Sequence, residues 1–333
     1  MYLYDNSRIP LDAGLGKSVF LCNDCKRCET YCIYKPKDVL KNNKAAKKIV
    51  FDNNCAPDEV YEIEKNLKKY RNITAKKNDG RNKRSGSSDY PNPDFSKKTA
   101  NILIYAGDYT RLFAPRLLDD FVKLLDHLGM DYAYDKNEVS DGMLALEFGM
   151  EEIARELIKE NCRRISNFDS DLVVVLSADS YYGFKKEYEK YGCRMKKNIM
   201  HYTEFLSNNI DKIKINKTND KLKYFDPCKL GRYSKIYEEP RNILACITSE
   251  KDIDFSKNRE ESMCCSGNIS FFDNHLSKKI AEEVIDEFKG SGSDIMITAC
   301  PLCLHNFKNA KNSKDLKIYE LLEYLVKNLN VKS

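Results

Sequence analysis

The sequence predicts an α/β protein with a small helical N-terminal domain and two following α/β repeats that contain short parallel sheets. Three observations lead to this prediction. From Asn101 onward short apolar strands alternate with amphipathic helices, the same order of elements occurs twice, and a cysteine-dense segment precedes both copies. At 333 residues, 42% of them apolar, the chain is long enough for several domains.

The N-terminal part ends in an amphipathic helix and a polar linker. Within residues 58–73, Val60, Ile63 and Leu67 fall on one helix face at spacings of three and four. The next segment is basic and rich in Gly, Ser and Pro, which is typical of an exposed linker. We therefore expect an N-terminal domain at 1–73, a linker at 74–98, a first repeat at 99–215 and a second repeat at 216–333.

Each repeat is predicted to alternate strands with helices in the same order. In the first repeat we expect strands at 101–107, 130–134 and 171–177 and helices at 115–129, 150–165 and 181–192. In the second repeat we expect strands at 221–227 and 294–300 and helices at 240–247, 276–292 and 316–329. Alternation of this kind predicts mostly parallel sheets.

Five positions in each repeat support an internal duplication, because they match at offsets of 120 to 124 residues. In the first repeat these positions are Asp108, Ser140, Asp141, Ser177 and Ser180, and their counterparts are Cys228, Cys264, Cys265, Cys300 and Cys303. No member of the first set is a cysteine. We therefore expect the first repeat to be a degenerate copy without metal ligands.

The thirteen cysteines point to metal or redox chemistry. The sequence has no apparent secretory signal and no apolar run long enough for a direct membrane span, so we expect a cytoplasmic protein. Cysteine-dense spacing in a reducing compartment favours metal sites over disulfides. Cys162, Cys193 and Cys246 stand alone and are expected to be buried core thiols. The net charge of +5 is spread along the chain, so no nucleic-acid partner is expected.

The first cysteine group, Cys22, Cys25, Cys28 and Cys32, has the spacing C-x2-C-x2-C-x3-C. This spacing is typical of a ferredoxin-type [4Fe-4S] cubane, because closely spaced thiolates can surround one compact cluster. Zinc sites more often use C-x2-C pairs separated by a longer insert. The fourth cubane ligand is either Cys32 or the downstream Cys55, and analogy with single-cluster ferredoxins favours Cys55.

The second group has the spacing C-x35-CC-x34-C-x2-C, beginning at Cys228 and ending at Cys303. Its cysteines follow predicted strands or lie in a glycine-containing loop. Loops at the carboxyl ends of parallel strands converge at one edge of a sheet, so five thiols should meet there. Five soft ligands exceed the four that one zinc ion takes, and they suit a polynuclear iron–sulfur centre.

The segments "DPCKLGRY", "CCSGN" and "ACPLC" resemble the cysteine-rich CCG domain. That domain occurs in the catalytic subunit of heterodisulfide reductase and in iron–sulfur subunits of thiol:fumarate reductase, glycolate oxidase and anaerobic glycerol-3-phosphate dehydrogenase. The resemblance implies that Cys228, Cys264, Cys265, Cys300 and Cys303 bind a non-cubane [4Fe-4S] cluster and form the catalytic site. This sequence departs from the family pattern at Ser266, where glycine is usual, and at Lys229, where many relatives have histidine.

The resemblance implies an iron–sulfur oxidoreductase subunit that passes electrons from the cubane to the CCG cluster and on to a disulfide or similar substrate. A redox partner subunit, either a flavoprotein or a membrane electron donor, and a small disulfide or thiol substrate are then expected. Two alternatives remain: an electron-transfer subunit for a partner flavoprotein dehydrogenase, and a non-redox scaffold stabilised by metal. Lys229 and Arg232 are candidates for binding an anionic substrate or cofactor, and the alternative for Arg232 is a surface ion pair.

Overall fold

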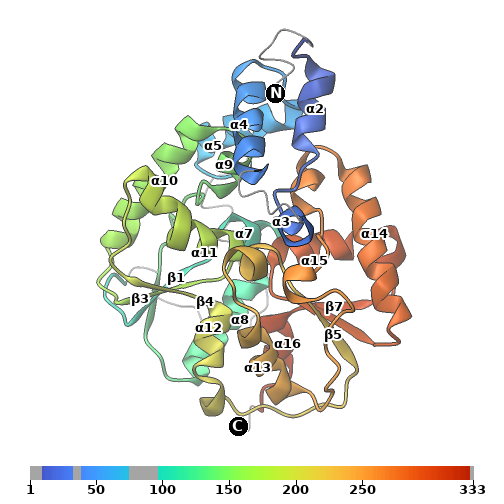
Figure 1. Ribbon diagram of the computed structural model, residues 1–333. Helices are drawn as coiled ribbons and strands as arrows, with labels where there is room; N and C mark the ends of the chain where they lie inside the picture. The colour runs from blue at the N-terminus through green and yellow to red at the C-terminus, as the bar shows by residue number, and fades with distance from the viewer. Residues whose placement is uncertain (1–9, 33–38, 75–96, 331–333) are drawn as a thin grey trace.

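The computed structural model describes residues 10–32, 39–74 and 97–330 and shows a mixed α/β protein (Figure 1). Most of the predicted linker, residues 75–96, lies outside the described residues. The N-terminal helices are α2 (Ala13–Phe20), α3 (Arg27–Tyr31), α4 (Val39–Asp52) and α5 (Asp58–Tyr70). As predicted, α5 buries Val60, Ile63 and Leu67. It begins with Asp58 and Glu59, whose charges complement the positive end of the helix dipole.

The first repeat is built on a parallel four-stranded sheet with the order β2-β1-β3-β4. Its strands are β1 (Ile102–Tyr105), β2 (Tyr132–Tyr134), β3 (Leu172–Val175) and β4 (Asn198–His201). Its helices are α7 (Asp108–Phe113), α8 (Arg116–His127), α9 (Met143–Glu147), α10 (Glu151–Ser166), α11 (Ala178–Tyr182) and α12 (Tyr202–Ser207). The central strand β1 is buried at every position, which explains its continuous apolar run.

The second repeat contains a parallel three-stranded sheet with the order β5-β6-β7. Its strands are β5 (Leu222–Phe225), β6 (Ile295–Thr298) and β7 (Lys317–Glu320). Its helices are α13 (Glu238–Ile247), α14 (Asn274–Gly290), α15 (Pro301–Lys308) and α16 (Leu321–Lys327), and a short π-helix, η4 (Lys229–Tyr233), follows β5. The counterpart of β2 is reduced to a single parallel bridge between Tyr224 and Asp254.

One predicted element is partly wrong. The sequence suggested a single helix over 316–329, but residues Lys317–Glu320 form the edge strand β7 and the helix starts only at Leu321. Along β7 exposed or half-buried residues alternate with buried Ile318 and Glu320. This period of two is typical of a strand that buries one face. Glu320 then caps α16 through its carboxylate, so the strand passes directly into the helix.

The two repeats face each other through reciprocal helix contacts. Helix α8 packs on α16, while α13, the counterpart of α8, packs on α12, the counterpart of α16. In the same way α7 packs on α15 and α11 packs on η4. Contacts of this kind define a pseudo-two-fold interface, as in a symmetric dimer. The loops after β5 and β6 therefore face residues of the first repeat.

The N-terminal helices pack over the junction of the two repeats (Figure 1). Phe20 at the end of α2 contacts Phe148 of the first repeat and Phe272 of the second, with ring centroids 5.7 and 5.9 Å apart. Gly149 has a φ of +83°, and a Cβ atom there would lie 2.7 Å from the backbone of Lys48 on α4. Only glycine permits so close an approach of helix and loop.

Candidate metal centre

The five cysteines of the second repeat lie together. Cys228 follows β5, Cys300 and Cys303 lie at the start of α15 after β6, and Cys264 and Cys265 come from the loop before α14. All five line one cavity. The convergence of these loops at the carboxyl ends of parallel strands is the arrangement that the sequence predicted.

Hydrogen bonds join the five thiols into a continuous network. Cys264 contacts both Cys228 and Cys265. Cys303 donates to Cys265 across 3.0 Å, and it also contacts Cys300. Hydrogen bonds from Cys264 and then from Cys303 lower the pKa of Cys265 well below its ordinary value. The network therefore contains a sulfur that favours the thiolate form, which is the form that binds iron.

A sixth thiol joins this network from the N-terminal group, and the sequence did not predict it. The side chain of Cys25 is hydrogen-bonded to Cys264, and this bond lowers the pKa of Cys25 to about 6. The contact joins two cysteine groups that are more than 200 residues apart in the chain. No local spacing signal could have revealed it.

The segment from Cys22 to Lys26 is held over the cavity by several hydrogen bonds. The side chain of Asn23 lines the cavity and donates to the Ser266 hydroxyl at 3.2 Å. The Tyr233 hydroxyl donates to the Asp24 carbonyl at 2.6 Å. Lys47 of α4 donates to the Asp24 carboxylate at 2.6 Å, and both side chains are fully buried. The N-terminal loop thus forms part of the wall of the cysteine cavity.

Arg232 fastens this loop to the second repeat. Its Nε donates to the carbonyl of Cys25 at 2.6 Å, and its Nη1 donates to the carbonyl of Ser262 at 2.6 Å. The residue is 2% exposed, so the alternative interpretation as a surface ion pair is wrong. Among the described residues no carboxylate lies within ion-pair distance of Arg232, and its Nη2 has no hydrogen-bond partner. Its positive charge is therefore not neutralised by a described acid, and it favours the thiolate of Cys25.

Lys229 is also buried, and the first repeat supplies its partner. Its ammonium pairs with the carboxylate of Glu147, and the side chains are 6% and 3% exposed. Asp179 of the first repeat lines the same cavity, while Asn268 donates to Glu147 at 2.6 Å. Lys229 thus has an acidic partner within the protein. Nothing in the sequence pointed to Glu147, whereas Asn268 belongs to the quoted segment "CCSGN" and could have been singled out.

The backbone conformation of Ser266 explains why glycine is usual after two adjacent cysteines. Its φ of +61° lies in the left-handed region, which glycine adopts without steric cost. The bend lets the Ser266 amide donate to the sulfur of Cys264 at 3.3 Å. Its hydroxyl accepts the hydrogen bond from Asn23. The serine therefore combines the bend with a contact to the N-terminal loop that glycine could not make.

The remaining cysteines of the N-terminal group are less closely gathered. Burial and then the Asp24 carboxylate raise the pKa of Cys22 to about 11. Cys28 is exposed, and Cys32 ends α3. The sulfur of Cys55 lies 3.7 Å from the carbonyl of Leu11, before the start of α2, whereas Cys22 follows the end of that helix. An eight-residue helix is about 12 Å long, so Cys55 and Cys22 lie at opposite ends of it.

The matching positions of the first repeat are occupied by a hydrogen-bonded polar cluster. The Ser180 hydroxyl donates to the carboxylate of Asp141, and the Tyr188 hydroxyl donates to the Asp141 carbonyl at 2.9 Å. Burial raises the pKa of Asp141 to about 7. A Cβ atom on Gly107 would lie 2.5 Å from the Ser180 hydroxyl, so β1 and α11 approach closely here. Ser180 and Asp141 are thus hydrogen-bonded within the first repeat.

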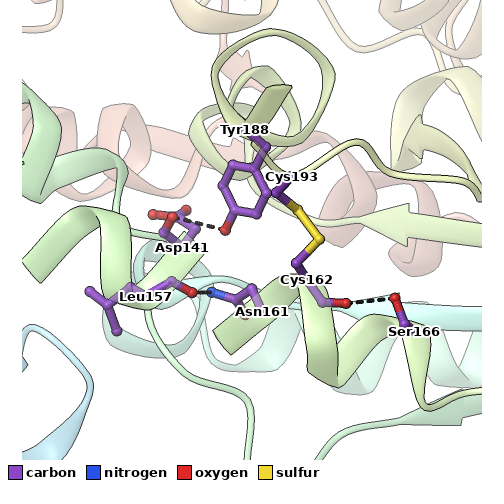
Figure 2. The surroundings of a disulfide bond; sticks show 7 residues. All are labelled: Asp141, Leu157, Asn161, Cys162, Ser166, Tyr188 and Cys193. Carbon is purple, nitrogen blue, oxygen red and sulfur yellow. Dashed lines mark hydrogen bonds between the residues drawn. A yellow bond between two sulfur atoms is a disulfide. The ribbon is translucent and has the colours of Figure 1, made fainter. Parts of the chain in front are cut away.

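Figure 2 shows that the expectation for two isolated cysteines was wrong. Cys162 on α10 and Cys193 form a disulfide, with Cα atoms 6.1 Å apart. It ties α10 to the segment that follows Tyr188, next to Asp141. Cys246 was also expected to be buried, but it is exposed on α13. The positions of these cysteines in the sequence did not indicate the pairing, because the partners are 31 residues apart.

The residues at the cavity fit an iron–sulfur cluster by their chemistry. Within the part of the chain that the structure describes, no three His, Cys, Asp or Glu side chains converge on one point as they would around a single ion. A cluster needs its thiols distributed over several iron atoms, and a network of five or six neighbouring thiols meets that need. The uncompensated charge of buried Arg232 also suits an anionic centre.

The second repeat, with its thiol site, is similar to a known cysteine-rich domain. Residues 222–308 match the family described as "CCG: Cysteine-rich domain". The matched residues include all five cysteines of the cavity. The resemblance inferred from "DPCKLGRY", "CCSGN" and "ACPLC" is therefore confirmed.

Three relatives of the chain carry the names of redox proteins. It is 22% identical to a "Probable iron-sulfur-binding oxidoreductase FadF" of Bacillus subtilis, over 96% of this chain and 47% of that protein. It is 23% identical to one subunit of a "Fumarate reductase (CoM/CoB)" of Methanothermobacter marburgensis, over 94% and 62%. It is 26% identical to one subunit of a "Dihydromethanophenazine:CoB--CoM heterodisulfide reductase" of Methanosarcina acetivorans, over 67% and 58%. The chain thus spans roughly half to three fifths of the length of these relatives.

A solved structure supports the fold alone. The crystal structure of a hypothetical protein from Helicobacter pylori aligns with a TM-score of 0.58 and 12% identity, over 90% of this chain and 60% of that one. Among the helices of the described residues, none combines the length and the apolar character needed to cross a membrane.

Proposed function

We propose that the chain is an iron–sulfur oxidoreductase subunit in which the second repeat, 216–333, holds a non-cubane [4Fe-4S] cluster and the N-terminal domain, 1–73, holds a cubane. Electrons would pass from the N-terminal site to the CCG site, and from there to a disulfide or a similar substrate. Bound at these thiols, iron–sulfur clusters supply one-electron transfer. The names of the relatives support a redox role of this class.

The observation that carries the proposal is the contact between Cys25 and Cys264. It leaves no protein segment between the two cysteine groups. Arg232 and Tyr233 hold the Cys25 loop in place through bonds of 2.6 Å to backbone carbonyls. Electron transfer between two centres requires a fixed and short separation, and this clamp supports the proposal that the two sites are held in that way.

The residues of the first repeat have a supporting role in this proposal. Glu147 holds the ammonium of Lys229 beside Cys228, and Asp179 contributes a carboxylate to the cavity wall. The first repeat, 99–215, then contributes charge and shape to a site whose thiols all come from elsewhere. Reduction of a disulfide to two thiols consumes two electrons and two protons. The electrons would come from a partner subunit that acts as a one-electron donor.

The cubane would be held by Cys22, Cys25 and Cys28 with a fourth cysteine. The position of the Cys55 sulfur beside Leu11 supports Cys32 as that fourth ligand, against the preference drawn from ferredoxins. Cys32→Ser should then lower the iron content and alter the cubane EPR signal, whereas Cys55→Ser should leave both unchanged. The opposite pattern would restore Cys55 as the ligand.

Iron counting and EPR on anaerobically reconstituted protein test the central claim. The wild-type chain should bind about eight irons in two clusters. Cys264→Ser should remove the signal of one cluster, and the matched control Cys246→Ser, at an exposed cysteine outside the network, should keep both. Four irons or fewer in the wild type would contradict the two-cluster proposal.

A second candidate is an electron-transfer subunit without a substrate of its own, which serves a partner flavoprotein dehydrogenase. The position of the N-terminal loop favours this second candidate, because Asn23 lines the cavity that a substrate would have to enter to reach the thiols. Reduction of a disulfide by the isolated protein with a viologen dye as electron donor separates the two functions. Sustained turnover would exclude the second candidate, and rapid cluster reduction without turnover would favour it.

A further inference from the structure

A cleft of about 550 Å³ lies beside the cysteine cavity, where the N-terminal helices meet both repeats. Its walls come from α3 and α4, from the segment after α11, and from η4. Seven of its lining residues are charged: Lys26, Lys41, Lys44, Lys186, Lys190, Glu29 and Glu187. A volume of this size is typical of sites for small ligands.

The lysines of the cleft exceed its acids, and only two of them are paired. Lys190 pairs with Glu187 at 2.8 Å, and Lys26 lies 3.6 Å from Glu29. Among the described residues, Lys41, Lys44 and Lys186 have no carboxylate within ion-pair distance. The lining of the cleft therefore carries an excess of positive charge, with five lysines against two glutamates.

Lys44 is the most informative of these lysines because it is half-buried. Burial, followed by the charge of nearby Lys229, lowers its pKa. The carboxylates of Glu187, Glu147 and Asp24 act in the opposite direction. A half-buried ammonium is still costly in the free protein, and an anion in the cleft would reduce this cost.

The cleft and the cysteine cavity share one wall. Tyr182 and Tyr233 line the cleft with ring centroids 4.8 Å apart. The ammonium of Lys229 lies behind them, 5.3 Å from the centre of the Tyr182 ring and 4.3 Å from that of Tyr233. Lys229 also lines the cysteine cavity. A ligand in the cleft would thus be one layer of side chains away from the thiols.

We propose that this lysine-lined cleft binds a small molecule that carries at least two negative charges, with Lys44 and Lys186 as its main contacts. The concave shape of the cleft and the half-buried position of Lys44 favour a small ligand over an acidic protein surface. In a version that rests on the function proposed above, the anion is the charged end of the disulfide substrate. Binding of the anion itself does not depend on that function.

Calorimetric titration of the anaerobic full-length protein with inorganic pyrophosphate at fixed ionic strength tests the inference. We expect saturable binding that weakens at least about tenfold in Lys44→Ala, since a hydrogen bond to a charged group is lost. Lys186→Glu, a change at an exposed position that should not disturb folding, is expected to weaken binding at least as much. The matched control is Lys279→Ala, at an exposed lysine of α14 outside the cleft.

The outcomes separate this inference from the proposed function. Absence of saturable binding to the wild type, or equal affinity in the wild type, Lys44→Ala and Lys186→Glu, would overturn the inference whatever the iron content. Binding by a protein that takes up no iron would support the cleft and refute the iron–sulfur function. In a second arm, oxidised glutathione replaces pyrophosphate as an anionic disulfide. Competition between the two compounds would support the substrate-bound version, and binding of pyrophosphate alone would limit the cleft to a free anion.

Discussion

Replacement of Arg232 tests how firmly the N-terminal cysteine loop is attached to the CCG site. Arg232→Ala removes two charge-assisted hydrogen bonds of 2.6 Å, to the carbonyls of Cys25 and Ser262, and a longer one of 3.3 Å to Glu260. Hydrogen bonds to charged groups contribute roughly 1.5–3 kcal/mol each, and of these bonds the one to Cys25 joins Arg232 to the N-terminal loop. The loop should therefore open more easily by about 1.5–3 kcal/mol.

Amide hydrogen exchange measures this opening directly. For peptides that cover residues 22–28, a loss of about 1.5–3 kcal/mol corresponds to exchange that is roughly one to two orders of magnitude faster. Arg232→Lys keeps the charge but cannot donate in the same fork, so its exchange should lie between those of wild type and Arg232→Ala. Peptides from the β5-β6-β7 sheet should be much less affected.

The control for this experiment is Arg164→Ala. Arg164 pairs with Glu160 and Asp135 at 3.0 Å, but its side chain is 26% exposed and it lies on α10. Its loss should cost about 1 kcal/mol or less and leave the 22–28 peptides unchanged. If Arg232→Ala exchanged like wild type in this segment, the guanidinium would not be what holds the loop.

Three further changes have defined outcomes. Cys162→Ser removes the disulfide to Cys193, and the 31-residue separation predicts that the free energy of unfolding, measured with denaturant, falls by about 3–4 kcal/mol. Complete alkylation of both thiols in the unreduced wild-type protein would disprove the pairing. Asp141→Asn should flatten the pH dependence of stability, because the pKa of Asp141 is about 7 in the folded protein and about 4 in the unfolded chain. The favourable contribution of Asp141 is full below pH ~4 and is lost as the pH rises through 7. A wild-type stability curve without this decline would contradict the assignment. Glu147→Gln leaves Lys229 buried without its partner and should cost about 3–5 kcal/mol, part of which Lys229→Met in the same chain should restore; additive losses would show that the two side chains do not interact.

The sequence predicted that the second cysteine group comes together, because most of that gathering depends on local patterns. Strand–helix alternation implies parallel strands, and parallel strands bring their following loops to one edge. The gathering of Cys228 and Cys300 follows from that rule, because each comes after a strand, whereas Cys264 lies in the loop before α14. Their network of hydrogen bonds then depends only on short-range distances within the shared cavity.

Contacts between distant segments could not be predicted in this way. Cys25 reaches Cys264, and Glu147 reaches Lys229, only because the N-terminal helices and the first repeat pack on the second. No periodicity or spacing in the sequence encodes that packing. Arg232 was misjudged for the same reason, since its burial depends on a loop more than 200 residues away. The strand β7 was missed because its four residues resemble the start of the helix that follows.

The clamp on the N-terminal loop also constrains the order in which the molecule is assembled. Asn23 leaves the ribosome well before its partner Ser266, which is made 243 residues later. The loop can therefore dock only after most of the second repeat has been synthesised and has begun to fold. Until then the CCG thiols remain uncovered on that side. Under the proposed function, a cluster would be inserted at these thiols during this interval, before the loop docks.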